Sequence, residues 1–209
     1  IVSNRDVTSP FITSIQESAV KPVEPVFLDF KKDMSQLTAK SDIPVLYKQN
    51  VTNDLFQLIY VFDMGNNNDK ALGTAFDYLE YLGTSDMTPE ELKSEFYRLA
   101  CTFYVSPGNE RTYVVLSGLN ENMPAAMQLF EKLLADAQVN KEAYDNLVGD
   151  ILKARADAKL NQGQNFSRLM NYAMYVPKSP ASNLLTEAEL ASMNPQELVD
   201  RIHNQNNYK

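Results

Sequence analysis

The stretch Gly73–Thr84, GTAFDYLEYLGT, is the segment around which the other expected elements are arranged. Apolar residues recur there and just before it at intervals of three and four, which predicts a helix with one buried stripe. The stripe consists of Ala71, Leu72, Ala75, Phe76, Leu79 and Leu82. Asp77, Glu80 and Tyr81 fall on the opposite side, and positions i, i+3 and i+4 share one helical face. We therefore expect these three side chains to be exposed to solvent.

The order D-Y-L-E-Y, followed by Gly83-Thr84, resembles the HFLEHMLFKGT helix of the pitrilysin/insulinase family of zinc peptidases. In that family H-x-x-E-H places two zinc ligands and a general base on one helical face. Here Asp77 and Tyr81 occupy the histidine positions, and Glu80 occupies the glutamate position. The resemblance continues through Glu90-Glu91-Leu92, CTFYVSPGNERTYVVLSGL and the later helices, and covers roughly Pro25 to Ile202. It implies that the chain is part of the family's second half, which keeps the fold and lacks the zinc motif.

Composition narrows the function classes. The chain has 209 residues, of which 44% are hydrophobic and 22% are charged, as in ordinary soluble globular proteins. A net charge of −8 argues against a nucleic-acid partner, because binding the phosphate backbone requires clustered Lys and Arg. One cysteine, Cys101, and one histidine, His203, exclude an intramolecular disulfide and the usual zinc sets of three or four Cys/His ligands. No apolar run has the length of about 18 residues that a membrane span needs.

Two regions are expected along the chain. Residues 1–26 are rich in Ser, Thr and Pro, which predicts a linker or docking arm. Residues 27–209 are expected to form a single α+β peptidase-like half-domain, and the first residue, Ile1, indicates a fragment of a longer chain. An exported parent protein would belong to a bacterial periplasm or cell envelope.

The expected half-domain contains two strand pairs. Ile43–Lys48 and Leu55–Phe62 are β-rich runs expected to form an antiparallel pair. The second run is apolar almost throughout, which predicts a central strand covered on both faces. Thr102–Val105 and Arg111–Leu119 flank the turn sequence SPGNE and form the other pair. The expected antiparallel sheet thus has at least four strands.

Several helices are expected to pack against this sheet. Thr88 with Glu91 forms a capping box for a helix ending near Leu99. Asn140 is an N-cap for a long helix that ends near Leu160. Further helices are expected over Met123–Ala135, Phe166–Tyr175 and two short segments ending near His203. The order of strands and helices indicates an α+β layered domain and excludes strict βαβ alternation.

A degenerate metal site is the first candidate for chemistry. In active family members the third zinc ligand is a glutamate roughly 75 residues beyond the second histidine, and Asp157 has the corresponding position here. The alternative is that Asp157 is a solvated residue among Lys153, Arg155 and Lys159. Glu80 and Asp157 alone would leave zinc under-coordinated. We therefore expect no catalytic residue, no metal and no cofactor in this chain, and expect the zinc in the catalytic half of the parent.

Nucleophilic chemistry is disfavoured as well. Cys101 as a nucleophile, or a Ser-His-Asp triad, would need His203 as the base, far away along the chain. A buried structural thiol is the favoured interpretation of Cys101.

The strand Thr102, Phe103, Tyr104, Val105 and Ser106 is the remaining binding candidate. In the family's active half the corresponding edge strand pairs with extended substrate, and unpaired edge amides and carbonyls accept a peptide strand. The alternative is that Phe103 and Val105 face a core and the edge is covered.

Three functions remain open. The first is a zinc-free half that, with a catalytic half in the same or a partner chain, encloses and binds a peptide substrate. The second is a peptidase-like scaffold or assembly subunit without a proteolytic role. The third is an independent metal-free enzyme, which would need a pocket of perturbed titratable groups.

Overall fold

The computed structural model describes residues 8–39, 42–176, 179 and 182–204. The chain divides into two compact units, Ile1–Lys48 and Gln49–Lys209. Each unit is described by itself below. The boundary predicted at residue 26 stays a prediction.

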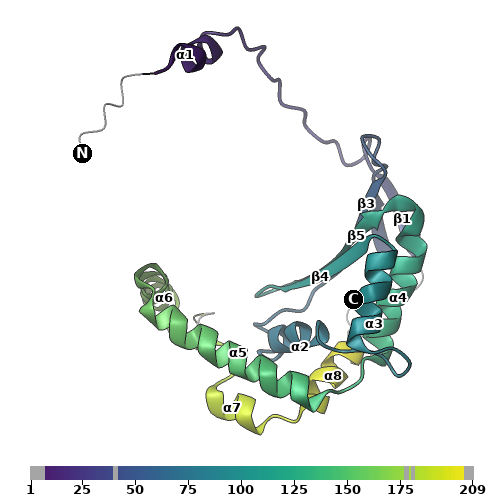
Figure 1. The fold of residues 1–209 in the computed structure, drawn as a ribbon, viewed down its shortest axis with the longest axis vertical. Coiled ribbons are helices and arrows are strands. Elements are labelled where there is room, and N and C mark those ends of the chain that lie inside the picture. The colour runs from purple at the N-terminus through teal and green to yellow at the C-terminus, as the bar shows by residue number, and fades with distance from the viewer. Residues whose placement is uncertain (1–7, 40–41, 177–178, 180–181, 205–209) are drawn as a thin grey trace. The chain divides into compact units, whose positions relative to one another are not determined.

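The first unit contains one short helix and one hairpin (Figure 1). The helix α1 spans Pro10–Gln16, begins after Ser9 as N-cap, and was not anticipated from the sequence. It buries no residue, and its apolar side chains Phe11, Ile12 and Ile15 are exposed. Strands β1 (Ser35–Ala39) and β2 (Ile43–Tyr47) pair antiparallel.

The expected pairing of Ile43–Lys48 with Leu55–Phe62 was wrong. β2 pairs with β1, which lies in a segment whose weak pattern gave no strand signal. Asp42, just before β2, has a φ of 60°, a left-handed conformation that Asp tolerates in tight turns. The segment expected to join the two strands instead forms a side-chain-bonded turn, in which Asn50 Nδ2 donates to the carbonyl oxygen of Leu55 over 2.9 Å.

The second unit is built on a three-stranded antiparallel sheet. β3 (Leu55–Phe62), β5 (Thr112–Leu119) and β4 (Cys101–Pro107) lie in the order β3-β5-β4. The predicted α+β class is confirmed, but the described strands form sheets of two and three strands and not one sheet of four or more. β5 is the central strand, so the expectation that 55–62 is central and covered on both faces was also wrong. Leu55, Ile59 and Val61 of β3 are about half exposed.

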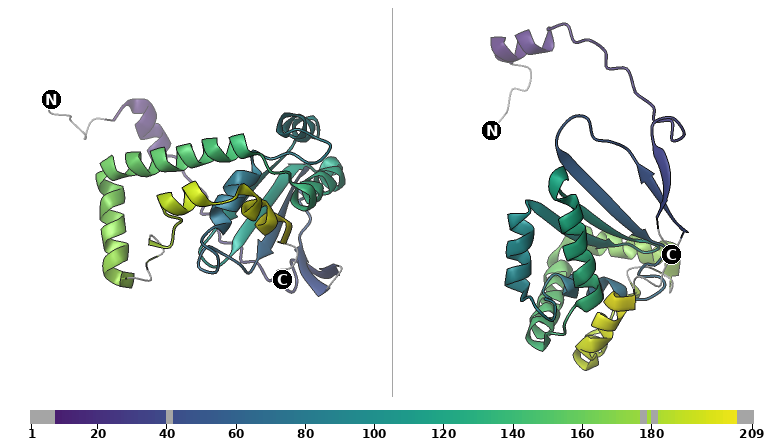
Figure 2. Two further views of the ribbon diagram at one scale, coloured as in Figure 1. Left: turned by 90° about the horizontal axis from the view of Figure 1, so that it is seen from below. Right: turned by 90° about the vertical axis from the view of Figure 1, so that its right-hand side faces the viewer.

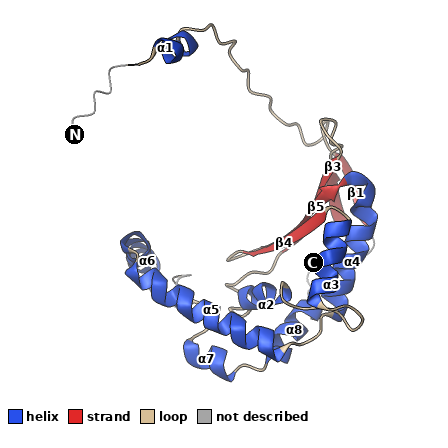
Figure 3. Cartoon of the chain, in the orientation of Figure 1, coloured by secondary structure: helices blue, strands red, loops and turns tan. Residues whose placement is uncertain are grey.

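Helices cover one face of this sheet (Figure 3). α3 (Pro89–Arg98) and α4 (Met123–Asp136) both contact it, and α4 follows a short 3₁₀ turn at Asn120–Asn122. The ring of Phe103 on β4 lies 5.1 Å from that of Phe96 on α3 and 4.9 Å from that of Phe130 on α4, between centroids. Alternate residues of the strands therefore point into the core, and the others form an outward face.

A second helical layer lies beside the sheet. α2 (Leu72–Leu79) contacts β4 and α8 (Pro195–His203), and α8 also contacts α4. The predicted apolar stripe of α2 is confirmed, because all six of its residues are buried. The capping box of Thr88 with Glu91 and the N-cap Asn140 are also present.

The remaining helices extend from this core. α5 spans Lys141–Leu160, and α6 spans Gln162–Tyr175 and turns away from the end of α5 (Figure 2, left). α7 (Glu187–Ser192) then returns to contact α5. Among the described residues, no helix combines the length and the apolar character needed to cross a membrane.

Candidate functional site

The motif helix α2 is held at its start by side chains from the preceding loop. Asn66 Oδ1 accepts a hydrogen bond from the backbone N–H of Gly73 over 2.9 Å, and Asp69 Oδ1 accepts one from Ala71 over 2.9 Å. These bonds satisfy amides that would otherwise lack partners at a helix start. The Asn- and Asp-rich loop therefore supplies the capping groups of α2, because the N-cap residue itself, Ala71, has no side chain that could do so.

The three motif residues lie on the exposed side of α2, as predicted. The last α-helical residue is Leu79, so Glu80 is the C-cap and Tyr81 continues in a tighter turn. Burial by neighbouring atoms, and secondarily the negative charge of Glu80, raises the pKa of Asp77. Lys93 Nζ lies 5.8 Å from the centroid of the Tyr81 ring, within cation–π range. The Lys93 ammonium group thus lies over the ring of Tyr81, the residue at the position of the second histidine in the family motif.

Asp157 is an exposed residue of α5, in agreement with the solvated alternative. Within residues 8–39, 42–176, 179 and 182–204, no three His, Cys, Asp or Glu side chains come together in a group able to hold a metal ion. Asp77, Glu80 and Asp157 thus do not make a ligand set. A carboxylate pair without imidazole or thiolate is also a poor zinc donor set in chemical terms.

Cys101 and His203 have separate structural environments. The Cys101 thiol is buried and donates to the carbonyl oxygen of Leu99 over 3.3 Å, and burial raises its pKa. A thiol with a raised pKa is a weak nucleophile at neutral pH. His203 Nε2 lies 3.1 Å from the carbonyl oxygen of Ala137 and is partly buried at the end of α8. His203 therefore ties the end of α8 to the end of α4.

The candidate binding strand is an edge of its sheet. β4 pairs with β5 on one side and, among the described residues, with no strand on the other. Phe103 and Val105 are partly buried against the core, as the alternative interpretation expected. Thr102, Tyr104 and Ser106 point outward and are exposed. The strand thus combines an inner side packed against the core with a backbone edge that pairs with no described strand.

The outward face of the sheet carries apolar side chains beside this edge. Val115 of β5 pairs with Tyr104 of β4 on one side and with Ile59 of β3 on the other. The three residues form one row across the sheet, since directly opposed residues point to the same face. In this row Tyr104, which is 50% exposed, is the residue next to the β4 edge, and Val115 behind it is buried.

A surface pocket of about 580 Å³ lies where α2 ends. It is lined by residues that follow the motif, including Gly83 and Thr84, and by the start of α5 at Asn140 and Lys141. Hydrogen bonds from Lys132 lower the pKa of Asp86 beside it. A carboxylate whose pKa is lowered is a weak general base at neutral pH. Asp86 is therefore a poor candidate for the general base that an independent enzyme would need.

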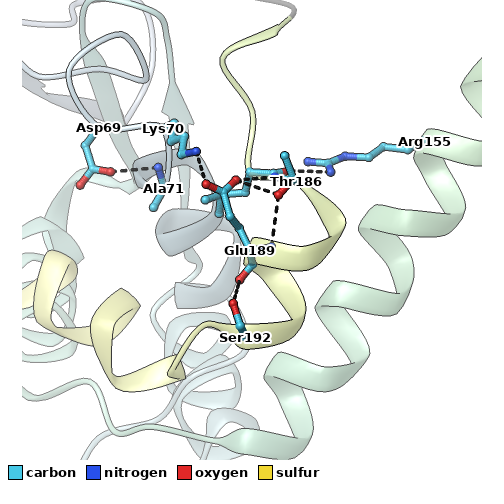
Figure 4. Close-up of polar contacts among 8 residues, drawn as sticks. Asp69, Lys70, Ala71, Arg155, Thr186, Glu189 and Ser192 are labelled. Atoms are coloured by element: carbon cyan, nitrogen blue, oxygen red, sulfur yellow. Dashed lines mark hydrogen bonds and ion pairs between the residues drawn. The ribbon is translucent and has the colours of Figure 1, made fainter.

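A polar cluster that sequence reasoning missed ties α7 to the loop before α2 (Figure 4), and an ion pair ties α8 to the same loop. Lys70 Nζ bonds to the Glu189 carboxylate, which also closes the capping box of α7 with Thr186. Lys70 and Thr186 lower the pKa of Glu189 to about 2. Arg155 Nη1 donates to the carbonyl oxygen of Leu185 over 2.7 Å, and Arg201 Nε pairs with Asp69 over 2.7 Å. Only the S/T-x-x-E pattern of Thr186 with Glu189 was visible in the sequence.

No protein-family model matches the sequence, and no curated protein is similar to it at a significant level. Solved structures do match the fold. The periplasmic protease PqqL from Escherichia coli superposes with a TM-score of 0.70 at 14% identity over 97% of this chain. An inactive M16 peptidase domain from Pseudomonas fluorescens superposes with a TM-score of 0.69 at 15% identity over 81% of this chain. The ferredoxin protease FusC, in complex with Arabidopsis ferredoxin, gives a TM-score of 0.69 at 12% identity over 92% of this chain.

These proteins are much longer than the region they share with this chain. It spans 23% of the PqqL chain, 42% of the Pseudomonas fluorescens chain and 23% of the FusC chain. At such low identity the likeness establishes the fold alone. The chain has the α+β half-domain fold of the pitrilysin-like M16 peptidases, a fold that it shares with a domain described as inactive.

Proposed function

We propose that this chain is a zinc-free, catalytically inactive half of a pitrilysin/insulinase-type zinc metallopeptidase, which helps to enclose and bind a peptide substrate. The observation that carries the proposal is that α2 keeps its buried apolar stripe but has no histidine at either zinc-ligand position. Its buried stripe is complete, while Asp77 and Tyr81 stand at the two histidine positions and Lys93 covers Tyr81. The helix has kept its packing role without the ligands that zinc catalysis requires.

Peptide binding is assigned to the outer edge of β4. A peptide added there would pair through main-chain hydrogen bonds with Thr102–Ser106, and its outward side chains would lie beside Tyr104 on the adjacent strand. The zinc and the activated water would come from a catalytic half in the same or a partner chain. This chain would contribute positioning and exclusion of solvent.

A pair of N-methylated peptides tests the edge assignment. In an antiparallel ladder only alternate amides of a strand face a given neighbour, so methylating one alternate set blocks pairing and methylating the other set does not. We expect an unstructured peptide to bind the chain, one methylated version to lose binding and the other to keep it, as measured by fluorescence anisotropy. Equal binding of both versions would assign recognition to side chains and not to the edge.

The alternative is a scaffold or assembly subunit with no proteolytic role. It shares the same fold and motif changes, and differs in having no use for the β4 edge. A chain that binds none of these peptides, and that hydrolyses none in the presence of added zinc, would favour the scaffold. Chelator-sensitive hydrolysis by the purified chain, abolished in Glu80→Gln, would contradict both proposals.

A further inference from the structure

The helix α6 presents an apolar face that the described residues of its unit leave exposed. Phe166, Leu169, Met170, Ala173 and Met174 recur at intervals of three and four and therefore share one side of the helix. None of the fourteen residues of α6 is buried, and Asn171, the least exposed of them, lies on the polar side. The apolar side of this helix thus points away from the rest of the unit.

The exposed area is large for a surface without a partner. On the apolar face, Phe166 is 62% exposed, Leu169 63%, Met174 60% and Met170 44%. These four large side chains together present roughly a few hundred Å² of apolar surface. A stable interface needs about 800 Å² from each partner. Contiguous apolar patches of a few hundred Å² often mark interaction sites in soluble proteins, and the rest of a stable interface would come from neighbouring residues.

Side-chain hydrogen bonds hold the corner between α5 and α6. Asn161 ends α5 and, as N-cap of α6, accepts a hydrogen bond from the N–H of Gln164 over 3.0 Å. Asn165 Nδ2 donates to the carbonyl oxygen of Lys159 over 2.7 Å. These bonds fix the direction of α6 relative to the end of α5. The apolar face is therefore displayed by a defined structure, which lowers the entropic cost of binding.

Charge is divided unevenly between this region and the elements before it. Residues 151–176, here called the arm, contain four Lys or Arg and one Asp, a net charge of +3. Residues 49–150, here called the body, contain six Lys or Arg and 16 Asp or Glu, a net charge of −10. The arm is thus complementary in charge to the body of another molecule of the same chain.

We propose that the arm binds the body of a second copy of this chain, and that the two copies form a symmetric dimer in which each arm contacts the other body. A two-fold axis makes such an exchange reciprocal and closed. A lipid surface suits the arm less well, because α6 has only one charged residue, Arg168, and the acidic body is repelled by anionic headgroups. The dimer does not depend on the proposed function, and either can fail without the other.

Sedimentation velocity of the purified chain tests the dimer, at concentrations from about 1 to about 200 µM. We expect a monomer–dimer equilibrium that weakens as salt rises from about 50 to about 500 mM, because screening reduces the attraction between arm and body. Leu169→Asp combined with Met170→Asp should weaken dimerisation by about tenfold or more. Lys153→Glu combined with Lys159→Glu should do the same at low salt and have less effect at high salt.

Controls separate loss of the interface from loss of the fold. The α6 variants should keep the circular dichroism spectrum and the thermal midpoint, since Leu169 and Met170 are both exposed residues. Val20→Asp, which places a charge on an exposed apolar residue of the first unit, should leave the dimer intact. A wild-type chain that stays monomeric at every concentration would overturn the proposal. So would a dimer that survives the α6 substitutions, or α6-dependent binding to anionic phosphatidylserine vesicles by a monomer.

Discussion

The phenol of Tyr78 donates a hydrogen bond to the carbonyl oxygen of Asn140 over 2.6 Å and accepts one from its backbone N–H over 2.8 Å. Asn140 is at the same time the N-cap of α5, through a bond from Ala143 N–H to its side chain. One residue of the motif helix thus fixes the residue from which the longest helix starts. Tyr78 is 0% exposed and stands between the two positions where the family resemblance places histidines.

Tyr78→Phe should lower the stability of the chain without changing its fold. The substitution keeps the ring and removes the partner of the Asn140 backbone N–H, whereas the Asn140 carbonyl oxygen keeps the bond from the Tyr144 N–H, so we expect a cost of about 0.5–1.5 kcal/mol. Chemical denaturation monitored by circular dichroism measures the loss. Tyr97→Phe is the matched control, because Tyr97 is 87% exposed and its hydroxyl is free to bond to water. Equal stability of the two variants would mean that the Tyr78–Asn140 bonds contribute nothing net.

Leu79→Ala and Glu80→Gln should have opposite outcomes although the residues are adjacent. Leu79 is buried against the core, so its truncation should cost about 2–5 kcal/mol, whereas an exposed substitution usually changes stability by no more than about 0.5 kcal/mol. The thermal midpoint should therefore fall clearly for Leu79→Ala and stay nearly unchanged for Glu80→Gln. The reverse order would show that Glu80 belongs to a buried polar network and that the motif face has a working role.

The isolated chain should contain no stoichiometric zinc when purified without chelators. Its motif positions Asp77 and Tyr81 supply no imidazole, and Glu80 with Asp157 is an inadequate donor set. Asp77→His combined with Tyr81→His places two imidazoles at i and i+4 and should gain zinc binding by elemental analysis. One tightly held zinc per wild-type chain would contradict the interpretation of the motif.

The attachment of α7 should weaken in acid. Lys70 and Thr186 lower the folded-state pKa of Glu189 from 4.5 to about 2, so the ionised carboxylate stabilises the fold fully above pH 4.5. That contribution is lost as the pH falls from about 4.5 to about 2. Glu189→Gln should therefore lower the thermal midpoint at pH 6 and have a diminishing effect toward pH 2. Glu187→Gln, on the same helical turn, is the control and should show no such pH-dependent difference.

Local signals predicted most helices correctly and long-range pairings poorly. The capping box of Thr88 with Glu91 and the N-cap Asn140 involve residues within three positions of each other, so the sequence contains the whole interaction. The partner of a strand is not a local property. β2 pairs with a segment of weak pattern, and the apolar run of β3 does not distinguish an edge strand with one apolar outer face from a central strand.

In the candidate site too, relations within one helix were predicted correctly and contacts between separate elements were not. The i, i+3, i+4 relation placed Asp77, Glu80 and Tyr81 on one exposed side, because that relation follows from helix geometry alone. The contact of Lys93 with Tyr81 and the pairing of Lys70 with Glu189 join separate elements, the second across 119 positions. No spacing rule predicts such contacts, since they depend on how the elements pack.

The continuous helix α5 also has a mechanical consequence. At about 1.5 Å per residue its 20 residues reach about 30 Å, so a tilt of about 10° at its first turn would swing its far end by about 5 Å. Two hydrogen bonds hold α5 in place. Tyr78 bonds to Asn140 at the first turn, and Arg155 bonds to the carbonyl oxygen of Leu185 further along the helix. If the Arg155 bond were lost, a small tilt at the first turn would displace the far end of α5, where α6 begins, by more than it does with both contacts in place.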